Sequence, residues 1–319
     1  MRYYDIQITN KDGSKYAQYT SLYPSGLTNA NALNVEFDIT QAPMHQPAGN
    51  SMVKVWGLDF KSFSNAMDFN GKNIKVFGGM QKGLPLANPK QAGLLIQGTI
   101  LQAFGNWVET DITVTFIIST GTGSPDAPLK LVFNWPKNSS LKTAISNMLN
   151  TAFPGIRQDF QINANLVLSN NQIGVYETLP AFSRMMNALS KAIITDPKYI
   201  GVTISFDGNV LTIADQPNPR NPIIKIVLAD LMQQPMWIAP NQIQCRFVMR
   251  GDLNISDQIT LPATPITTTA AASTQFQDPS TFSGTYMIQF LRHVGNFRQW
   301  DGASWNTTAN MTPSPKTST

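Results

Sequence analysis

The sequence predicts a mainly β fold with a small α+β insert. Three observations predict it: short alternating strands fill the first 120 residues, the apolar period becomes helical in the middle of the chain, and alternating strands return near residue 229. We therefore expect two β-barrel units, 1–120 and 229–305, on either side of an α+β unit, 121–228. Residues 306–319 are polar and contain two prolines, which predicts a flexible C-terminal tail.

Regularly spaced strands indicate a barrel or a sandwich in the first unit. Residues 34–39 and 51–58 alternate apolar with polar side chains, as half-buried strands do. The polar segment 59–67 fits a short helix that caps an open end of the barrel. Further strands are expected at 73–77, 94–100 and 111–117.

The middle unit has a different period. A Gly-, Ser- and Pro-rich loop at 120–128 marks its start, and apolar residues then recur at helical spacing over 139–149. Pro154 and Gly155 end this helix, and a second helix is expected at 181–194. Two strands, 201–206 and 210–213, flank an Asp-Gly-Asn turn and predict a hairpin.

Strands return in the last unit at 242–249, 258–261 and 284–291. The segment 262–283 between the last two strands is rich in Thr, Ala, Ser and Pro. Such a composition buries too little apolar surface to offset the entropy of ordering. We expect this loop to contribute no core residues and to become ordered against neighbouring subunits or partners.

The composition excludes several classes of protein. Of 319 residues, 42% are hydrophobic and 13% are charged, and the net charge is 23 − 19 = +4, which argues against disorder and against specific nucleic-acid binding. One cysteine and two histidines leave no soft-metal site and no internal disulfide. We find no apolar run of membrane-spanning length and no signal peptide, and expect a soluble protein made in the cytoplasm.

No catalytic motif stands out, so we predict no catalytic, cofactor-binding or metal-binding residue. His293 fits a hydrogen-bonding structural residue better than a general base, His45 a surface or contact residue, and Cys245 a core residue. A pair of the 19 acidic residues could still converge in a glycosidase cleft. Five tryptophans fit core or interface anchors better than a sugar-stacking surface: Trp107, Trp135, Trp237, Trp300 and Trp305.

Eight local patterns, taken in order, are similar to those of one known family. The opening barrel matches at 37–39, 52–58, 70–79 and 96–100, the entry to the last barrel at 228–235, 243–249 and 253–261, and the closing signature at 286–296 before Trp300 or Trp305. Together they resemble the trimeric tail hub (baseplate hub) proteins of long-tailed, and more specifically contractile-tailed, bacteriophages. Two residues depart from the family pattern: Ser256 replaces a glycine and Asn296 an aspartate.

The resemblance implies two tube-like β-barrels and a structural function without enzymatic activity. It implies a homotrimer in the baseplate of the virion that adapts the six-fold tail tube to the three-fold central spike and forms part of the DNA channel. The implied partners are the tail tube and central spike proteins, with the tape-measure and baseplate wedge proteins. The alternative is a tail-tip module that degrades or binds cell-wall glycans.

The implied symmetry makes two further predictions. Three subunits can meet a six-fold ring only if each offers two equivalent modules, so the two β units should share a strand order and superpose. Some apolar residues of two neighbouring strands should also point away from the first core, toward a contact between subunits. These residues are Val53, Val55, Trp56, Ile74, Val76 and Phe77.

Overall fold

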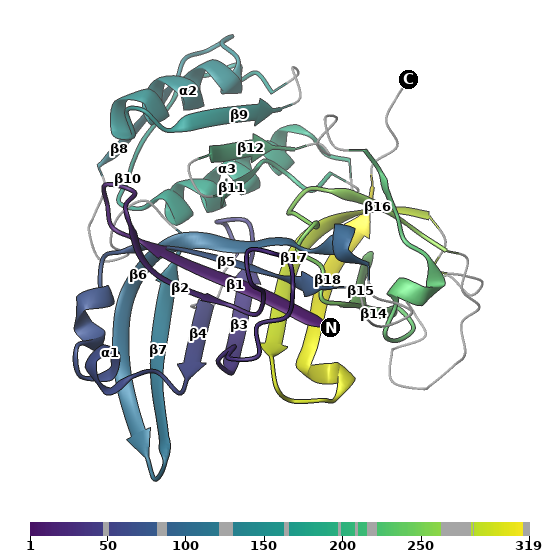
Figure 1. Cartoon of the computed structure of the whole chain (residues 1–319). Helices are drawn as coiled ribbons and strands as arrows, with labels where there is room; N and C mark the ends of the chain where they lie inside the picture. Colours follow the sequence, from purple (N-terminus) through teal and green to yellow (C-terminus); the bar gives the residue numbers. More distant parts are fainter. Residues whose placement is uncertain are drawn as a thin grey trace.

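The computed structural model is mainly β with a small helical insert, as the sequence predicts (Figure 1). Its described residues bury three separate hydrophobic cores, which lie mainly within 4–118, 131–213 and 226–311. None of the helices in this described part is long and apolar enough to cross a membrane. The described residues are 1–46, 51–81, 88–120, 130–162, 166–196, 199–207, 210–215, 222–262, 282 and 284–314.

The first core is enclosed by seven strands and a short helical cap. Asp59 caps the helix α1 (Phe60–Ser64) by accepting a hydrogen bond from the Ser62 amide, and a 3-10 turn, η1 (Ala66–Phe69), follows. The expected strands and the expected cap are present, together with two N-terminal strands that the sequence analysis did not assign. The strands are β1 (Arg2–Thr9), β2 (Lys15–Thr20), β3 (Val35–Gln41), β4 (Ser51–Trp56), β5 (Asn73–Met80), β6 (Gly93–Val108) and β7 (Asp111–Ser119), with η2 (Pro89–Gln91) before β6.

The expectation that some apolar side chains of β4 and β5 point away from the first core is confirmed. Val53, Val55, Ile74 and Val76 are all fully buried in it, because residues two apart on a strand share a face. Trp56 and Phe77 lie on the opposite faces of β4 and β5 and are half-buried. Their contact with another subunit stays a prediction.

The middle unit packs two helices against two small sheets. The helix α2 (Leu141–Ala152) begins at Ser140, whose hydroxyl accepts from the Thr143 amide, and ends just before Pro154 and Gly155. The predicted hairpin is present, although residues 208 and 209 of its turn and residues 121–128 of the predicted boundary loop lie outside the described residues. The remaining elements are β8 (Leu131–Trp135), β9 (Arg157–Gln161), β10 (Gln172–Tyr176), α3 (Leu179–Ile193), β11 (Thr203–Asp207) and β12 (Val210–Ala214).

The last unit differs from expectation at two places. The predicted flexible tail 306–319 is wrong over most of its length, because β18 pairs on both edges and buries Ala309 and Met311. The predicted coreless loop 262–283 is wrong at Phe282, which is buried against Trp237; residues 263–281 lie outside the described residues. The elements are β13 (Ile224–Lys225), η3 (Leu228–Asp230), β14 (Met236–Ala239), β15 (Gln242–Val248), β16 (Gln258–Leu261), β17 (Gly284–Asn296), η5 (Gly302–Ser304) and β18 (Trp305–Pro313).

The two β units share one sheet. Strand β17 pairs with β3, which joins the strands of both units into a 13-stranded sheet with the order β14-β15-β18-β17-β3-β4-β7-β6-β5-β1-β2 and a branch of β16 and β13 from β17. The middle unit lies to one side of this sheet (Figure 1). We expected two separate barrels, and the structure instead connects the two units edge to edge.

Candidate functional site

The same strand order occurs twice in this sheet. In the first unit the spatial order is β3-β4-β7-β6-β5-β1, and in the last unit it is β14-β15-β18-β17-β16-β13. The first unit has one extra strand, β2, beyond β1 at the end of this order. If the other six strands of each unit are numbered in chain order, their spatial order is the same in both units, so the two units match strand for strand. Five of the six strands also pair in the same directions; only β13, two residues long, runs parallel where β1 runs antiparallel. The strand-order part of the symmetry prediction is therefore confirmed.

The residue registers of the two units also match. The pair β6–β7 shifts register around Leu101, and the pair β17–β18 shifts around Gln289. One residue before each shift, a strand residue exchanges two backbone hydrogen bonds with a tight turn: Ile100 with residues 71 and 72, and Ile288 with residues 256 and 257. A bulge and a turn at the same places in both units make the repeat specific, residue by residue.

The tight turn explains the first departure from the family pattern. Gly71 has φ +75°, and Ser256 at the equivalent place has φ +70°. This left-handed conformation favours glycine. Ser256 therefore keeps the turn geometry and strains the backbone to do so.

The two units meet along β17 and β3, where the second departure lies. Arg292 forms two hydrogen bonds with the Asp38 carboxylate, of 2.8 and 2.5 Å. The Asn296 amide donates to Glu36 Oε1 at 2.8 Å, and its Oδ1 accepts from the amide of Arg298 at 3.2 Å. An aspartate at 296 could accept but could not donate to Glu36, so the asparagine suits this junction.

A second junction brings two glycines into contact. A Cβ on Gly93 would lie 2.2 Å from the carbonyl oxygen of Gly251, and a Cβ on Gly251 would lie 2.6 Å from the backbone of Gly93. The Gly251 amide also donates to the Gln91 carbonyl at 2.8 Å. The backbones of the two units touch here with no room for any side chain.

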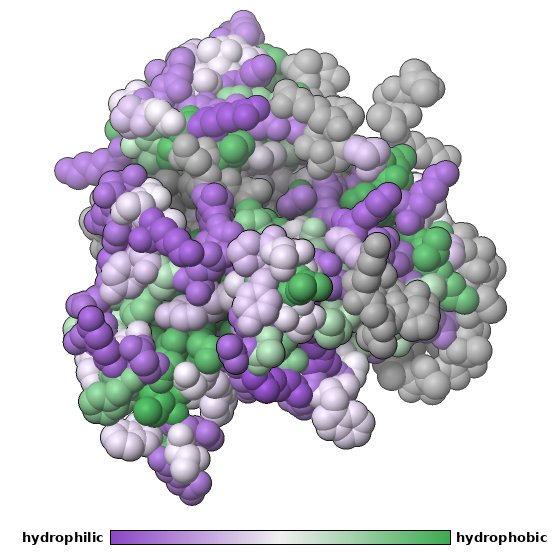
Figure 2. All heavy atoms as spheres, in the orientation of Figure 1, coloured by the Kyte–Doolittle hydropathy of each residue, from purple (hydrophilic) through white to green (hydrophobic). Residues whose placement is uncertain are grey.

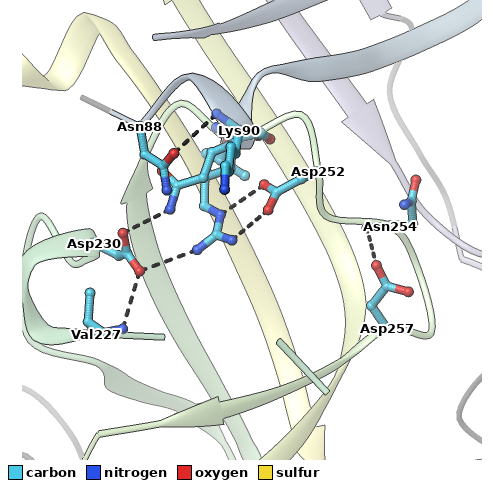
Figure 3. Close-up of polar contacts among 10 residues, drawn as sticks. Asn88, Lys90, Val227, Asp230, Asp252, Asn254 and Asp257 are labelled. Atoms are coloured by element: carbon cyan, nitrogen blue, oxygen red, sulfur yellow. Dashed lines mark hydrogen bonds and ion pairs between the residues drawn. The ribbon is translucent and has the colours of Figure 1, made fainter. Parts of the chain in front are cut away.

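Beside the glycines lies a buried ionic network (Figure 3). The guanidinium of Arg250, on a residue 3% exposed, forms two hydrogen bonds with Asp252, of 2.9 and 2.6 Å, and lies 3.5 Å from Asp230. Asp230 also accepts from the Gln91 side chain at 2.9 Å and from the Val227 amide at 3.2 Å. Figure 3 shows Asp230 and Asp252 on opposite sides of the guanidinium. The network ties η3 and the segment that follows β15 in the last unit to η2 of the first.

A third contact joins the two units through Trp305 and Arg2. The indole of Trp305 is buried in the first core and donates to the Gly79 carbonyl at 2.9 Å. Arg2 donates to the carbonyls of Asn296 and Asp301, at 2.5 and 2.6 Å, and its guanidinium lies 5.6 Å from the Trp305 ring. Three separate contacts therefore hold the two β units at one relative orientation.

An open cavity of about 420 Å³ lies next to this last contact. Arg2, Met80, Phe297 and Trp305 line part of it, and Trp300 stands at its rim with 95% of its surface exposed. The two terminal nitrogens of the Arg2 guanidinium donate to the backbone carbonyls of Asn296, Gln299 and Asp301.

The side chains that the sequence analysis considered for chemistry do not converge. His293 is fully buried and makes a 2.9 Å hydrogen bond with Thr307 Oγ1, and its burial lowers its pKa to about 3. Cys245 is buried in the last core, where burial raises its pKa to about 12, and His45 is half-buried with its pKa lowered by burial. The structural readings of His293 and Cys245 are confirmed.

The five tryptophans do not gather on one surface, although Trp300 and Trp305 line the same cavity. Trp135 is buried in the middle core and Trp305 in the first, while Trp107 is exposed at the tip of the β6–β7 hairpin. Trp237 packs on Phe282 in the last core. They form no common sugar-stacking surface. Within the described residues there is also no group of three or more metal-ligating side chains that could hold an ion.

The residues that fix the junction were not found from the sequence. Arg250, Gly93 and Gly251 have ordinary neighbours in the chain, and their contacts come from segments far away in sequence. The signal that could have found the junction is the pairing of β3 with β17, which periodicity does not contain.

Comparison with known proteins gives matches at the level of structure. The chain matches no family model and no curated protein by sequence. It is similar to the 43 kDa tail protein of prophage MuSo2 from Shewanella oneidensis, with a TM-score of 0.53, 10% identity, and 98% of this chain and 97% of that chain covered.

Two further solved structures are similar to this chain. The E. coli c3393 protein, a component of the type VI secretion system described as similar to the T4 bacteriophage tail proteins gp27 and gp5, has a TM-score of 0.52, 8% identity, and coverage of 90% and 76%. A chain of the PdpA-VgrG complex has a TM-score of 0.51, 8% identity, and coverage of 99% and 66%. These similarities are similarities of fold. The chain has the fold of a phage tail protein, as the tail hub resemblance implies.

Proposed function

We propose that this chain is the structural subunit of a trimeric hub in a phage tail baseplate. In this role three copies present six similar β units to the six-fold tail tube and a three-fold assembly to the central spike. The same proposal places the protein in the virion and gives it no enzymatic activity.

The single observation that carries this proposal is the repeated β unit. A subunit that contains two units of the same strand order can imitate two of the six members of a ring. The units must also keep one relative orientation to match the ring. The paired strands β3 and β17, the Gly93–Gly251 contact and the buried Arg250 network supply that rigidity.

The joined sheet also supports a role in the DNA channel. Its outward face around the junction carries charges that are already paired within the chain: Arg292 binds Asp38, and the Lys54 ammonium lies 5.0 Å from the Trp56 ring. Unpaired cations would hold DNA by its phosphates. A face with paired charges lets DNA pass without binding it, and we place this face on the channel wall.

The partners in this proposal are the tail tube protein on one side and the central spike protein on the other. Tape-measure and baseplate wedge proteins complete the surroundings. The similarity to a type VI secretion component and to a chain of the PdpA-VgrG complex favours a contractile machine.

The mass of the native assembly tests the proposal. Native mass spectrometry of the purified chain should give three times 35.1 kDa, about 105 kDa. Negative-stain images of the trimer should show a ring with six similar lobes. A monomer, dimer or hexamer would contradict the hub function.

A peptidoglycan digestion assay tests the alternative, a glycan-degrading tail-tip module. The proposal expects no release of soluble fragments. Fragment release that is lost on changing one acidic residue to its amide would replace the structural function with an enzymatic one.

A further inference from the structure

We propose that the outer half of β6 in one copy of the chain pairs with β14 of the next copy. Each contact between copies would then repeat the β17–β3 contact inside the copy. This inference rests on the proposed trimer and adds the strands and the residue register that hold it together.

The template is the way β17 changes partners along its length. Its first residues, Gly284–Met287, pair with β16, and its outer residues, Leu291–Asn296, pair with β3 of the other unit. The outer half of this strand thus links one β unit to the next.

The equivalent strand β6 lacks the second of these partners. Its first half pairs with β5 as far as Thr99, and among the described residues only β7 pairs with it beyond that point. At the other end of the sheet, β14 is the counterpart of β3, and within the described residues β15 is its one partner strand. Figure 1 shows β6 and β14 on opposite sides of the molecule, as the two ends of a subunit in a closed ring must be.

The internal contact fixes the expected register on β6. Phe104 lies three residues after the bulge residue Leu101, as Arg292 lies three residues after Gln289. Phe104 therefore occupies the place of Arg292, which faces Thr40 on β3.

The register on β14 follows in the same way. Asp38 pairs with Met52 of β4, and Met236 pairs with Gln244 of β15. Met52 and Gln244 hold equivalent places, because their partners on β7 and β18 lie opposite the two bulges. Met236 thus takes the place of Asp38. Counted along the outer edge of β14, Ile238 follows at the place of Thr40, where the pairing of β14 with β15 shifts register between Trp237 and Ala239. Phe104 of one copy should face Ile238 of the next.

The side chains at these positions suit a contact between separate molecules. Phe104 and Ile238 are 43% and 41% exposed, and Trp107, Val108 and Met236 near them are also exposed. Figure 2 shows apolar surface both near α1, β6 and β7 and near the opposite side of the molecule. Exposed apolar residues along an unpaired strand edge indicate that another chain covers this edge.

The internal contact has polar residues at the equivalent places, namely Arg292 and Thr40. The chain itself holds that contact together. A contact between copies must supply its own affinity, and an aromatic side chain facing a β-branched one does so.

The helical cap of the first unit leaves room for this pairing. Asn70 Oδ1 accepts from the Ala103 amide at 2.7 Å, so new pairing starts after that residue. The two-residue turn between Val108 and Asp111 directs the backbone groups of Phe104 toward β7 and those of Gly105 toward the open edge. Phe104 and Ile238 then form a non-hydrogen-bonded pair.

Disulfide trapping tests the register. Cα atoms in a non-hydrogen-bonded antiparallel pair lie about 4.5 Å apart, within the range that a disulfide spans. The double variant Phe104→Cys/Ile238→Cys should form covalent dimers and closed trimers under mild oxidation, seen on a non-reducing gel. Cys245 is buried and does not compete.

Two matched variants control the experiment. Phe104→Cys/Met236→Cys moves one thiol two residues along the strand, which brings the Cα separation to roughly 8 Å, beyond disulfide reach. It should give little cross-linking. Arg292→Cys/Thr40→Cys places two cysteines at the equivalent positions of the internal contact, where they should form a disulfide within a single chain.

The outcomes separate this inference from the proposed function. If the unmodified chain is a trimer and the Phe104/Ile238 pair does not cross-link, the strand pairing is wrong and the trimer stands. If the shifted control cross-links as well as the predicted pair, the register is wrong. A monomeric unmodified chain overturns both proposals.

Discussion

Replacing Arg250 should destabilise the whole molecule. The change Arg250→Met keeps the length and apolar stem of the side chain but removes the guanidinium from between Asp252 and Asp230. The Arg250 side chain is 4% exposed, and those of Asp252 and Asp230 are 27% and 16% exposed. Both carboxylates would then lose their cation without gaining full access to water.

The magnitude follows from that partial burial. Removing one partner of a buried ion pair costs about 3–5 kcal/mol, and the partial exposure of both carboxylates places this case near the lower end. We expect a loss of about 3 kcal/mol in the free energy of unfolding. Arg250→Lys keeps the charge but not the two parallel hydrogen bonds to Asp252, and it should lose less.

Urea denaturation followed by tryptophan fluorescence measures the effect. A double-mutant cycle with Asp252→Asn isolates the interaction between Arg250 and Asp252, because the asparagine removes one of the two carboxylates left beside the methionine. Asp252→Asn should recover part of the loss in the Arg250→Met background. A loss below about 1 kcal/mol for Arg250→Met, a value typical of surface pairs, would refute it.

Three further changes have expected outcomes. Ser256→Gly should raise the free energy of unfolding by roughly 0.5–1 kcal/mol, because relief of the left-handed backbone outweighs the entropy that glycine loses; thermal unfolding measures it, and a drop in melting temperature would contradict the strain. Asn296→Asp should lower the free energy of unfolding at pH 7 by about 1–2 kcal/mol, because it replaces the hydrogen bond to Glu36 with a second carboxylate; the deficit should shrink in urea titrations near pH 4, and a constant deficit would argue against charge repulsion. His293 stays neutral in the fold with a pKa of about 3, while the unfolded chain takes up a proton near its ordinary value of 6.5, so stability is lost as the pH falls between these values. From pH 7 to pH 5 the wild type should lose about 2 kcal/mol more than His293→Gln, and parallel pH profiles would exclude this histidine as the cause.

The strands that alternate strongly were predictable, and β18 was not. Its residues 306–312 are mostly Asn and Thr, a composition that indicates a loop when the sequence is read alone. They form a strand because β15 and β17 pair with both of its edges and supply partners for its backbone groups. Pairing with distant strands therefore determines the conformation of this segment, although its composition favours a loop.

The repeated β unit and the contacts between the two units could not be predicted from the sequence for a related reason. Equivalent positions in the two units share a place in the sheet but not a side chain: Val53 corresponds to Cys245, and Gly105 to His293. What the two units have in common is the hydrogen-bond register, and that register leaves little trace in residue identity. The Arg250 network likewise depends on a partner, Gln91, that lies in the other unit.

The pairing of β3 with β17 has a consequence for synthesis on the ribosome. The paired residues, from Gln41 with Leu291 to Glu36 with Asn296, are 250 to 260 positions apart, so β3 is made long before its neighbour exists. At a synthesis rate of about 5–20 residues per second, the outer edge of β3 stays unpaired for roughly 13–50 s. Glu36 and Asp38 face outward on that edge during the wait, and negative charges on an open edge discourage pairing with the wrong chain. Arg292 and Asn296 later bind these same two carboxylates, so the groups that protect the nascent edge become the contacts that fasten the finished subunit.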